Sequence, residues 1–171
     1  MIELIINSFW IILPAYCSNF FPVVVRGKTP IDLNKNFIDN KRVFGDGKTI
    51  RGFISGSLFG IFIGMLQIYL QQYTGNNLIF NHTVLSVILL SVGALIGDLI
   101  GSFVKRRFEM KRGDPAPLLD QLDFVIMSLV LLSLAYKINF SYIFFLVLIT
   151  PILHLFSNLT AYILKLKNKP W

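Results

Sequence analysis

Five apolar segments dominate this sequence of 171 residues and most constrain how it can fold. A helix that crosses the hydrocarbon core of a bilayer, about 30 Å thick, needs roughly 20 apolar residues. The segments cover residues 2–25, 52–73, 84–104, 118–136 and 141–164. Only 15% of the residues are charged, against about 25% in soluble domains, and five segments leave little room for a separate soluble domain. The sequence therefore predicts an all-α integral membrane protein, with one membrane-embedded domain over residues 1–171 and about five transmembrane helices.

Positive charge is distributed very unevenly between these segments. Seven of the 16 lysines and arginines lie between the first and second segments, five between the third and fourth, and three after the fifth. Only Lys137 falls in the opposite set of loops. Cytoplasmic loops carry an excess of Lys and Arg, so we expect the N-terminus outside, the C-terminus in the cytoplasm, and two cytoplasmic loops at residues 26–51 and 105–117. Charge on such short loops beside a bilayer argues against a nucleic-acid partner.

Glycine recurs every fourth residue in two of the segments. The residues are Gly52, Gly56, Gly60 and Gly64 in the second segment, and Gly93, Gly97 and Gly101 in the third. Residues four apart share a helix face, and small residues there let another backbone approach closely. We expect the second segment to pack tightly against the third or another helix. The alternative is a glycine face that meets lipid and has no structural role.

A carboxylate interrupts the third apolar segment. Asp98 lies six residues before the end of that segment, about 9 Å below the interface. A charge within an apolar helix costs at least about 2.5 kcal/mol on insertion scales. Ser102, Lys105 and Arg106 follow on the same helix face. Asp98 is therefore either neutralised by a neighbouring cation or part of a metal or phosphate site at the cytoplasmic mouth.

The fourth segment adds two more carboxylates at the same membrane edge. Its uninterrupted apolar part, residues 124–136, is too short to cross alone, so the helix must extend back through Asp120 and Asp123. Spaced three apart, these two lie on one helix face. They act either as caps that complement the helix dipole or, together with Asp98, as ligands of a metal ion. Oxygen ligands alone favour Mg²⁺ over zinc.

The stretch "GDGKT" at residues 45–49 resembles a P-loop only superficially. Arg42 stands where a Walker A motif requires glycine, and no apolar strand precedes it. The glycine-rich turn is still suited to binding phosphate through backbone N–H groups, with Lys48, Thr49 and Arg51 beside them.

Two other kinds of chemistry find little support. The pattern of CDP-alcohol phosphotransferases begins well at Asp46-Gly47, but Gly64 and Ile68 stand where its later metal-binding aspartates belong. His82 lies in an outer loop, and His154 is alone in the last segment. The charged loops therefore offer no histidine or cysteine for covalent catalysis.

Two motifs read together resemble the phosphatidate cytidylyltransferase superfamily. They are "GDLIGSFVKRR" at 97–107 and "KRGDPAPLLDQLDF" at 111–124. The chain departs from the bacterial and eukaryotic pattern in the turn "DPAPL" and in Gln121, which replaces an arginine between the two aspartates. Both departures, with "FGDGKTIRG" and the N-terminal "LPAYCSNFFPV", resemble the archaeal branch, the CDP-archaeol synthase family. The likeness extends over nearly the whole chain.

That resemblance implies a reaction, its substrates and a cofactor. Family members transfer a cytidylyl group from CTP to 2,3-di-O-geranylgeranylglycerol 1-phosphate with Mg²⁺, which gives the CDP-activated lipid and pyrophosphate. The nucleophile is the phosphate of the lipid, which is already anionic, so no strong general base is needed. The required catalysis is positioning and charge stabilisation. The partners implied are CTP, an isoprenoid glycerol phosphate and the cell membrane, with the active site on the cytoplasmic face; a homo-oligomer stays open.

On this basis the site residues fall into three groups. The expected metal ligands are Asp98, Asp120 and Asp123. Lys105 and Arg106 are expected to act directly in catalysis, and the groups expected to bind CTP or lipid phosphate or to support them are Ser102, Lys111, Arg112, Asp114, Gln121, Gly45, Gly47, Lys48, Thr49 and Arg51. The alternatives are another lipid-headgroup enzyme such as a CDP-alcohol phosphotransferase, and a non-enzymatic membrane protein or transporter. A transporter would carry polar residues near the bilayer centre on several segments, whereas here they concentrate at one edge.

Overall fold

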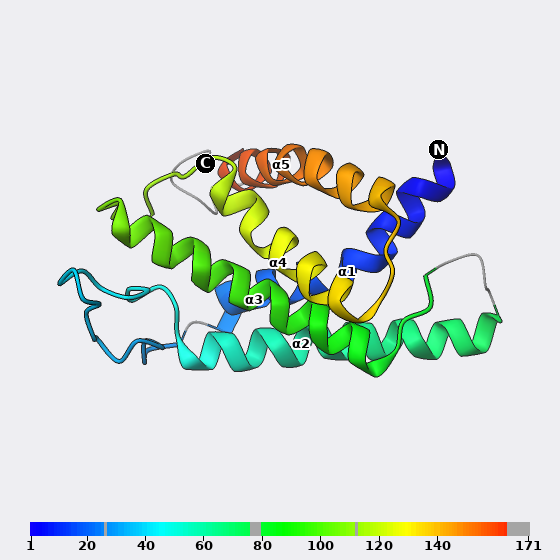
Figure 1. The fold of residues 1–171 in the computed structure, drawn as a ribbon, viewed down its shortest axis with the longest axis horizontal. Helices are drawn as coiled ribbons and strands as arrows, with labels where there is room; N and C mark the ends of the chain where they lie inside the picture. The colour runs from blue at the N-terminus through cyan, green and yellow to red at the C-terminus, as the bar shows by residue number, and fades with distance from the viewer. Residues whose placement is uncertain (26, 76–79, 112, 164–171) are drawn as a thin grey trace.

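The computed structural model describes residues 1–25, 27–75, 80–111 and 113–163. This part of the chain forms five helices and no β-strand (Figure 1): α1 (Ile2–Val25), α2 (Ile50–Thr74), α3 (Val84–Arg107), α4 (Leu119–Ala135) and α5 (Phe140–Ile163). The predicted all-α fold is confirmed. α1, α2 and α3 are each long and apolar enough to cross a membrane, so the chain is a multi-pass membrane protein.

The helix boundaries differ from the predicted ones mainly at the charged loops. Thr49 caps α2, since its hydroxyl accepts a hydrogen bond from the amide of Gly52 at 3.1 Å, and α2 therefore begins two residues early. α3 continues three residues beyond the apolar segment, to Arg107. Basic residues are favourable at the C-terminus of a helix because they complement its dipole. The first cations of the predicted second loop consequently lie on the last turn of α3.

α1 contacts all four other helices, α3 contacts α1, α2 and α4, and α5 packs against α4 and α1. A core of aliphatic residues from α1, α3, α4 and α5 lies between them, with Ile11, Leu90, Val125, Leu132 and Leu146 almost fully buried. The outer faces expose large apolar side chains such as Ile54 and Leu58. Lipid would cover such faces in a bilayer.

Both glycine faces mark close helix contacts, as predicted. A Cβ at Gly56 would clash with the Ser18 carbonyl of α1, and one at Gly64 would clash with Val87 of α3. The glycines of α3 face α4 instead: a Cβ at Gly97 would meet the Asp123 backbone. The glycine face of α2 thus contacts both α1 and α3, and the glycine face of α3 lets α4 pack closely against it.

A proline inside α1 explains a polar network at one end of the bundle. Pro14 has no N–H to donate to the carbonyl of Trp10, four residues earlier. Gln67 of α2 donates to that carbonyl instead, at 2.8 Å, and Nε2 of His82 lies 3.1 Å from it. His82, predicted in an outer loop, is thus at this uncharged end.

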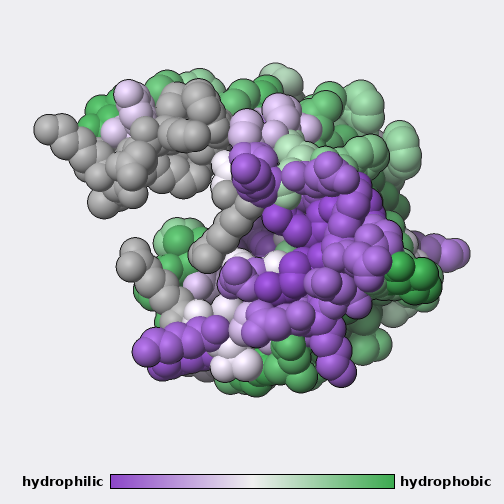
Figure 2. Space-filling view, turned by 90° about the vertical axis from the view of Figure 1, so that its left-hand side faces the viewer, coloured by the Kyte–Doolittle hydropathy of each residue, from purple (hydrophilic) through white to green (hydrophobic). Residues whose placement is uncertain are grey.

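The opposite end of the molecule is strongly polar. The loop 27–49, the last turn of α3 and the start of α4 meet there (Figure 1), and Figure 2 shows hydrophilic residues gathered over this end. Ion pairs concentrate at the same place, among them Lys41–Glu109, Arg42–Asp32, Lys48–Asp98, Lys105–Asp120 and Arg107–Asp39. The two predicted charged loops therefore lie side by side.

Candidate active site

A buried carboxylate organises the loop 27–49. Asp32 accepts hydrogen bonds from the guanidinium of Arg42 at 2.8 Å and from the amides of Asn34, Phe44 and Gly45 at 3.2, 3.0 and 2.8 Å. Burial alone would raise the pKa of the Asp32 carboxyl, but these hydrogen bonds outweigh it and hold that pKa well below its usual range. Gly45 adopts φ +88°, which glycine accommodates without strain. The ionised Asp32 thus fixes the turn that carries Asp46 to Thr49.

The same loop is fastened to the end of α3. The guanidinium of Arg107 contacts the carboxylate of Asp39 at 3.1 Å and donates to the carbonyl of Arg42 at 2.5 Å. It also lies over the rings of Phe37 and Phe103, 5.2 and 4.5 Å from their centroids, as in cation–π contacts. These contacts hold the loop against the last turn of α3.

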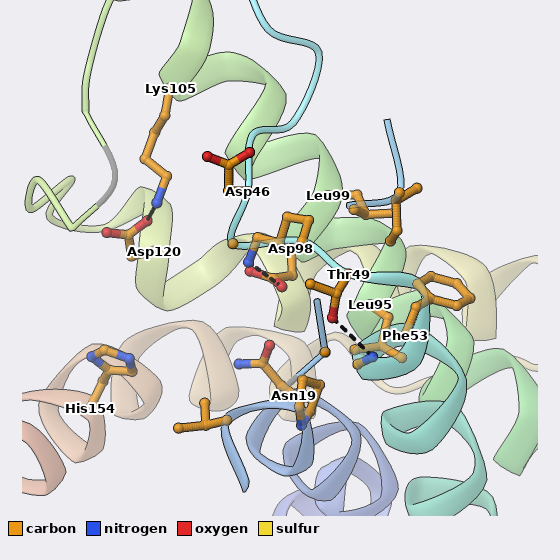
Figure 3. A pocket seen from close by; sticks show the side chains of 17 residues that line it. Asn19, Asp46, Thr49, Phe53, Leu95, Asp98, Leu99, Lys105, Asp120 and His154 are labelled. Carbon is orange, nitrogen blue, oxygen red and sulfur yellow. Dashed lines mark hydrogen bonds and ion pairs between the residues drawn. The ribbon is translucent and has the colours of Figure 1, made fainter. Parts of the chain in front are cut away.

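A cavity of about 710 Å³ opens between this loop and the helices, a volume typical of small-molecule sites. Its charged lining comes from the loop 27–49, α3 and α4: Asp46, Lys48, Asp98, Lys105 and Asp120. Its apolar lining includes Val23, Phe53, Leu95 and Leu99, and its neutral polar lining includes Asn19, Thr49 and His154. Figure 3 shows side chains from all five helices or their ends around one space. A charged rim therefore borders an apolar, membrane-side interior.

Two of the predicted carboxylates each hold a lysine. Nζ of Lys48 lies 2.5 Å from Asp98, and Nζ of Lys105 lies 2.5 Å from Asp120 (Figure 3). The second oxygen of Asp120 accepts from the amide of Ala116 at 3.1 Å. Neutralisation of Asp98 by a cation, one of the two expectations for it, is therefore seen, and the cation comes from the other loop.

The third predicted carboxylate, Asp123, lies behind the cavity wall. One oxygen accepts from the amide of Phe124 at 2.6 Å, and the other packs against Gly101 of α3, where no Cβ would fit. Its carboxylate lies near those of Asp98 and Asp120. The three carboxylates are neighbours, but only two of them line the cavity.

The carboxylates fit a hard cation by their chemistry, although they do not form a closed cage. No group of three or more acidic, histidine or cysteine side chains in the described residues stands ready to hold a metal ion. Asp98 and Asp120 supply oxygen donors, the type that Mg²⁺ prefers, and each now holds the ammonium group of a lysine at a place where a metal cation would compete.

The remaining predicted residues are more dispersed. Thr49 and Gly47 line the cavity, whereas Arg51 lies in a separate groove of about 400 Å³ with Ile54 and Leu58. Ser102 is buried and outside the lining. Arg106 packs beside Gly45, where its side chain would lie 3.7 Å from an added Cβ.

Of the last four predicted residues, Lys111, Arg112 and Asp114 come between α3 and α4 in the sequence, and Gln121 lies in the first turn of α4. The carboxylate of Asp114 accepts from the amide of Lys111 at 2.6 Å, which fixes a turn. Gln121 accepts from the amide of Leu118 at 3.4 Å and so helps to start α4. Neither side chain lines the cavity. Arg112 lies outside the described residues.

Several lining residues were missed by the sequence analysis. His154 lines the cavity, so the expectation of no histidine near the charged loops is wrong. It lies 37 residues after the second charged loop and 103 after the first, and only the packing of α5 against α1 and α4 brings it there. Asn19 is a polar side chain inside an apolar segment, and that feature could have identified it as a candidate site residue. Asp46 is part of the incomplete CDP-alcohol phosphotransferase pattern, and the rejection of that pattern left it out of the predicted site.

The arrangement is suited to binding phosphates. Lys48 and Lys105 present ammonium groups to the cavity, and Thr49 begins α2, whose N-terminus favours anions. The carboxylates beside them suit a divalent cation that accompanies a polyphosphate. The apolar interior next to this rim suits the tail-proximal part of an amphiphile.

Comparison with known proteins gives a consistent result. The family model described as CarS-like, CDP-archaeol synthase, matches residues 1–171. Proteins named CDP-archaeol synthase from Methanocaldococcus jannaschii and Pyrococcus abyssi are 45% and 46% identical to this chain, covering 99% and 98% of it and 98% of each relative. The relative from Archaeoglobus fulgidus is 43% identical over the full length of both chains. A solved structure described as "an intramembrane enzyme for archaeal membrane lipids biosynthesis" superposes with a TM-score of 0.77 at 37% identity, covering 90% of this chain and 93% of the other.

Proposed function

This chain belongs to the CDP-archaeol synthase family, and on that basis we propose that it transfers a cytidylyl group from CTP to an isoprenoid glycerol phosphate. A phosphate oxygen of the lipid attacks the α-phosphorus of CTP, the bond from that phosphorus to the bridging oxygen breaks, and pyrophosphate leaves. The products are the CDP-activated lipid, expected to be CDP-2,3-di-O-geranylgeranylglycerol, and pyrophosphate.

One observation carries this proposal: a charged rim and an apolar interior share a single cavity at the edge of a membrane bundle. A nucleotide triphosphate requires cations and a polar entrance, whereas a lipid phosphate requires an apolar approach. The reaction needs both substrates in one place, since most of its acceleration comes from positioning and from stabilising charge on phosphorus oxygens. The lipid phosphate is already anionic, which agrees with a rim that offers cations rather than a strong base.

The lysines of the rim act on the phosphates. Lys48 and Lys105 exchange their carboxylate partners for phosphate oxygens when nucleotide enters, and Thr49 with the N-terminus of α2 adds backbone N–H donors. Arg106 and Ser102 support this wall from behind. Asp114 fixes a turn of the second loop through the amide of Lys111, and Gln121 helps to start α4. Lys111 and Arg112 are the further cations expected to meet phosphate, while Gly45 and Gly47 let the first loop pass close to the nucleotide. Arg51 stands at the bilayer edge beside its own groove.

Asp98, Asp120 and Asp123 would hold Mg²⁺ in this proposal. When bound, the ion supplies neutralisation of charge on the triphosphate and the leaving pyrophosphate. Asp98 and Asp120 line the cavity and face the phosphates directly. Asp123 sits one layer behind, packed against Gly101, with its carboxylate near that of Asp98. Lys48 and Lys105, which pair with two of these carboxylates, would then be available to the substrate phosphates.

We place this cavity on the cytoplasmic face, where CTP is made. The 16 lysines and arginines support this orientation, because they concentrate in the two loops that form the rim and after α5. The residues 1–171 would then act as a single membrane-embedded domain.

The test is pyrophosphate release by the purified protein in lipid nanodiscs, with CTP, Mg²⁺ and a di-isoprenoid glycerol phosphate. We expect stoichiometric pyrophosphate and CDP-lipid, lost when CTP or the lipid phosphate is omitted and when EDTA is present. UTP and ATP in place of CTP test nucleotide choice, and a diacyl glycerol phosphate tests lipid choice. Absence of pyrophosphate with every lipid phosphate would contradict the proposal, and full activity in EDTA would contradict only its metal.

A further inference from the structure

Two neutral polar side chains line the active-site cavity apart from its charged rim. Asn19 comes from α1 and His154 from α5. In Figure 3 the amide of Asn19 and the imidazole of His154 face the space on the helix side of Asp98 and Asp120. Neither helix contributes a charged residue to the lining. These two residues therefore mark a second polar region of the same cavity.

Their position places this region within the membrane. Asn19 lies six residues before the end of α1 and His154 nine residues before the end of α5, distances of about 9 and 14 Å along the helices. The lining beside them is apolar and includes Pro22, Val23 and Leu95. Asn19 and His154 therefore give the apolar side of the cavity two side chains that can donate hydrogen bonds to a polar ligand at that depth.

We propose that Asn19 and His154 are positioning residues that bind the phosphate of the lipid substrate and hold it in line with the α-phosphorus of CTP. This inference rests on the proposed function. The nucleotide triphosphate takes the charged rim formed by Lys48 and Lys105. The lipid reaches the same centre from the apolar side, where Asn19 and His154 are the polar side chains on α1 and α5 that meet its head.

The chemistry of the nucleophile explains why neutral donors suit this place. A lysine or arginine bound tightly to the attacking phosphate would withdraw charge from its oxygens and lower their reactivity. An amide N–H and an imidazole N–H orient a phosphate through shorter-range, weaker hydrogen bonds. Removing one neutral hydrogen bond typically weakens binding by about 3- to 10-fold.

The experiment separates the two substrates kinetically. The variants Asn19→Leu and His154→Ala are compared with wild type for KM of CTP at saturating lipid and KM of lipid phosphate at saturating CTP. We expect the KM for lipid phosphate to rise about 3- to 10-fold in each variant, with the KM for CTP within twofold of wild type. His154→Gln, which keeps an N–H donor, should recover part of the affinity. Leu155→Ala, next along α5 with an exposed side chain outside the cavity, is the control.

A binding measurement without turnover keeps this test independent of catalysis. Native mass spectrometry with a di-isoprenoid glycerol phosphate, in the absence of CTP, should show weaker retention by Asn19→Leu and His154→Ala and unchanged retention by Leu155→Ala. An unchanged KM and unchanged retention of the lipid would overturn the inference. A rise confined to the KM for CTP would overturn it too, because the pair would then contact the nucleotide. If wild type released no pyrophosphate but the retention differences held, the proposed function alone would fail.

Discussion

The lysine–carboxylate pairs of the rim balance the charges that line the cavity. Lys48 comes from the loop before α2 and Asp98 from α3, yet their charged atoms are 2.5 Å apart, and Lys105 with Asp120 repeats the arrangement. Each carboxylate inside the bundle would otherwise lack a counter-charge, which is costly near an apolar interior. When substrate and a metal cation bind, the phosphates can replace the carboxylates as partners of the lysines, and the cation can replace the lysines as partner of the carboxylates. The pairs are therefore suited to keeping the site stable without ligand and to opening when ligand binds.

Substitutions at the Lys48–Asp98 pair should impair catalysis while the protein still inserts into the membrane. We expect Asp98→Asn and Lys48→Gln each to lower kcat/KM for CTP by about 100-fold or more. Lys48→Gln removes a cation that would meet the phosphates, and Asp98→Asn removes a carboxylate that would hold Mg²⁺. The measurement is steady-state pyrophosphate release. Lys35→Gln, an exposed lysine of the same loop outside the cavity, is the matched control and should stay near wild type. Near-normal turnover of both pair variants would show that this wall does not contact the reacting phosphates.

Asp32 gives a second prediction, which concerns the folding of the loop rather than the chemistry. The pKa of Asp32 is lowered in the folded protein, so its stabilising effect is present above the ordinary carboxyl range near pH 4 and is lost as pH falls through the lowered value. The loop should stay folded at mildly acidic pH in wild type.

Asp32→Asn should release this loop already at neutral pH, since Arg42 and the amides of Phe44 and Gly45 lose their anionic acceptor. The rate of cleavage within residues 27–49 under limited proteolysis would measure this release of the loop. Asp39→Asn carries the same substitution in the same loop, but Asp39 is exposed and forms one ion pair with Arg107, so it should change cleavage little. Equal protection of the Asp32→Asn and wild-type loops at pH 7 would contradict the role of Asp32.

At this scale the sequence predicted the types of residue better than their partners. The insertion cost of Asp98 and the short apolar part of the fourth segment singled out three carboxylates, of which Asp98 and Asp120 line one cavity and Asp123 lies behind its wall. The buried role of Asp32 was not predictable, because its partners are backbone amides twelve and thirteen residues away. His154 reached the site only through helix packing, which no local pattern in the sequence encodes.

At the scale of helices, glycine decides how deeply α4 and its aspartates sit. Gly97 and Gly101 let α4 approach α3 until the backbone and carboxylate of Asp123 occupy the space of the missing Cβ atoms. A larger residue would push the start of α4 outward. Asp123 and Asp120, one helical turn apart, would then move relative to Asp98.

Gly101→Ala should therefore reduce activity per folded molecule as well as stability. Overpacking of this kind typically costs about 1–3 kcal/mol. Gly64→Ala, which meets Val87 in the half of the bundle away from the cavity, is the matched control: it should lower stability similarly and leave kcat per folded molecule unchanged. The readouts are thermal unfolding in detergent and turnover normalised to folded protein. The same loss of turnover in both variants would mean that general loosening, not the placement of Asp123, is responsible.

Helix α1 offers an independent test of packing at the uncharged end. The Trp10 carbonyl, freed by Pro14, is held by Gln67 and His82. Gln67→Leu combined with His82→Phe removes both donors and should lower stability by about 1–3 kcal/mol, the cost of an unsatisfied buried carbonyl. Adding Pro14→Ala returns the missing N–H and should recover part of that loss, whereas Pro14→Ala alone should not stabilise the wild type. If the effects of the three substitutions on the free energy of unfolding were additive, the idea that all three act on the Trp10 carbonyl would be wrong.

The helices themselves followed from the sequence, but their contacts followed only in part. Apolar length predicted all five helices within about three residues, because a bilayer leaves the backbone no other way to satisfy its hydrogen bonds. The glycine spacing predicted close contact without naming the neighbours. The face of α2 meets α1 at Gly56 as well as α3 at Gly64, a choice that depends on how the whole bundle is packed.

At the scale of the whole molecule, charge and neutral polarity divide between the two ends. The charged end holds the cavity, the loop 27–49 and the ion pairs (Figures 1 and 2). The other end holds hydrogen bonds between uncharged groups of Asn7, Trp10, Gln71, Phe80 and His82. An enzyme that draws one substrate from water and the other from the bilayer needs only one polar opening. The uncharged network closes the far end without adding a second.

The orientation across the membrane can be tested together with the crossing of α4. At 17 residues, α4 spans about 25 Å, less than the average hydrocarbon thickness, and crosses only if the bilayer thins or flanking residues reach the interface. Cysteines would be placed singly at exposed Lys35, Asn81 and Lys137 in a Cys17→Ala background. These positions lie in the loop before α2, between α2 and α3, and between α4 and α5.

A membrane-impermeant maleimide should label the cysteines at positions 81 and 137 on intact cells, and the one at position 35 only after permeabilisation. Three crossings, by α2, α3 and α4, separate position 35 from position 137. Labelling of 81 but not 137 on intact cells would show that α4 enters the membrane without crossing it. The opposite pattern at every site would place the cavity on the outer face, away from cytoplasmic CTP, and would contradict the positive-inside assignment on which that placement rests.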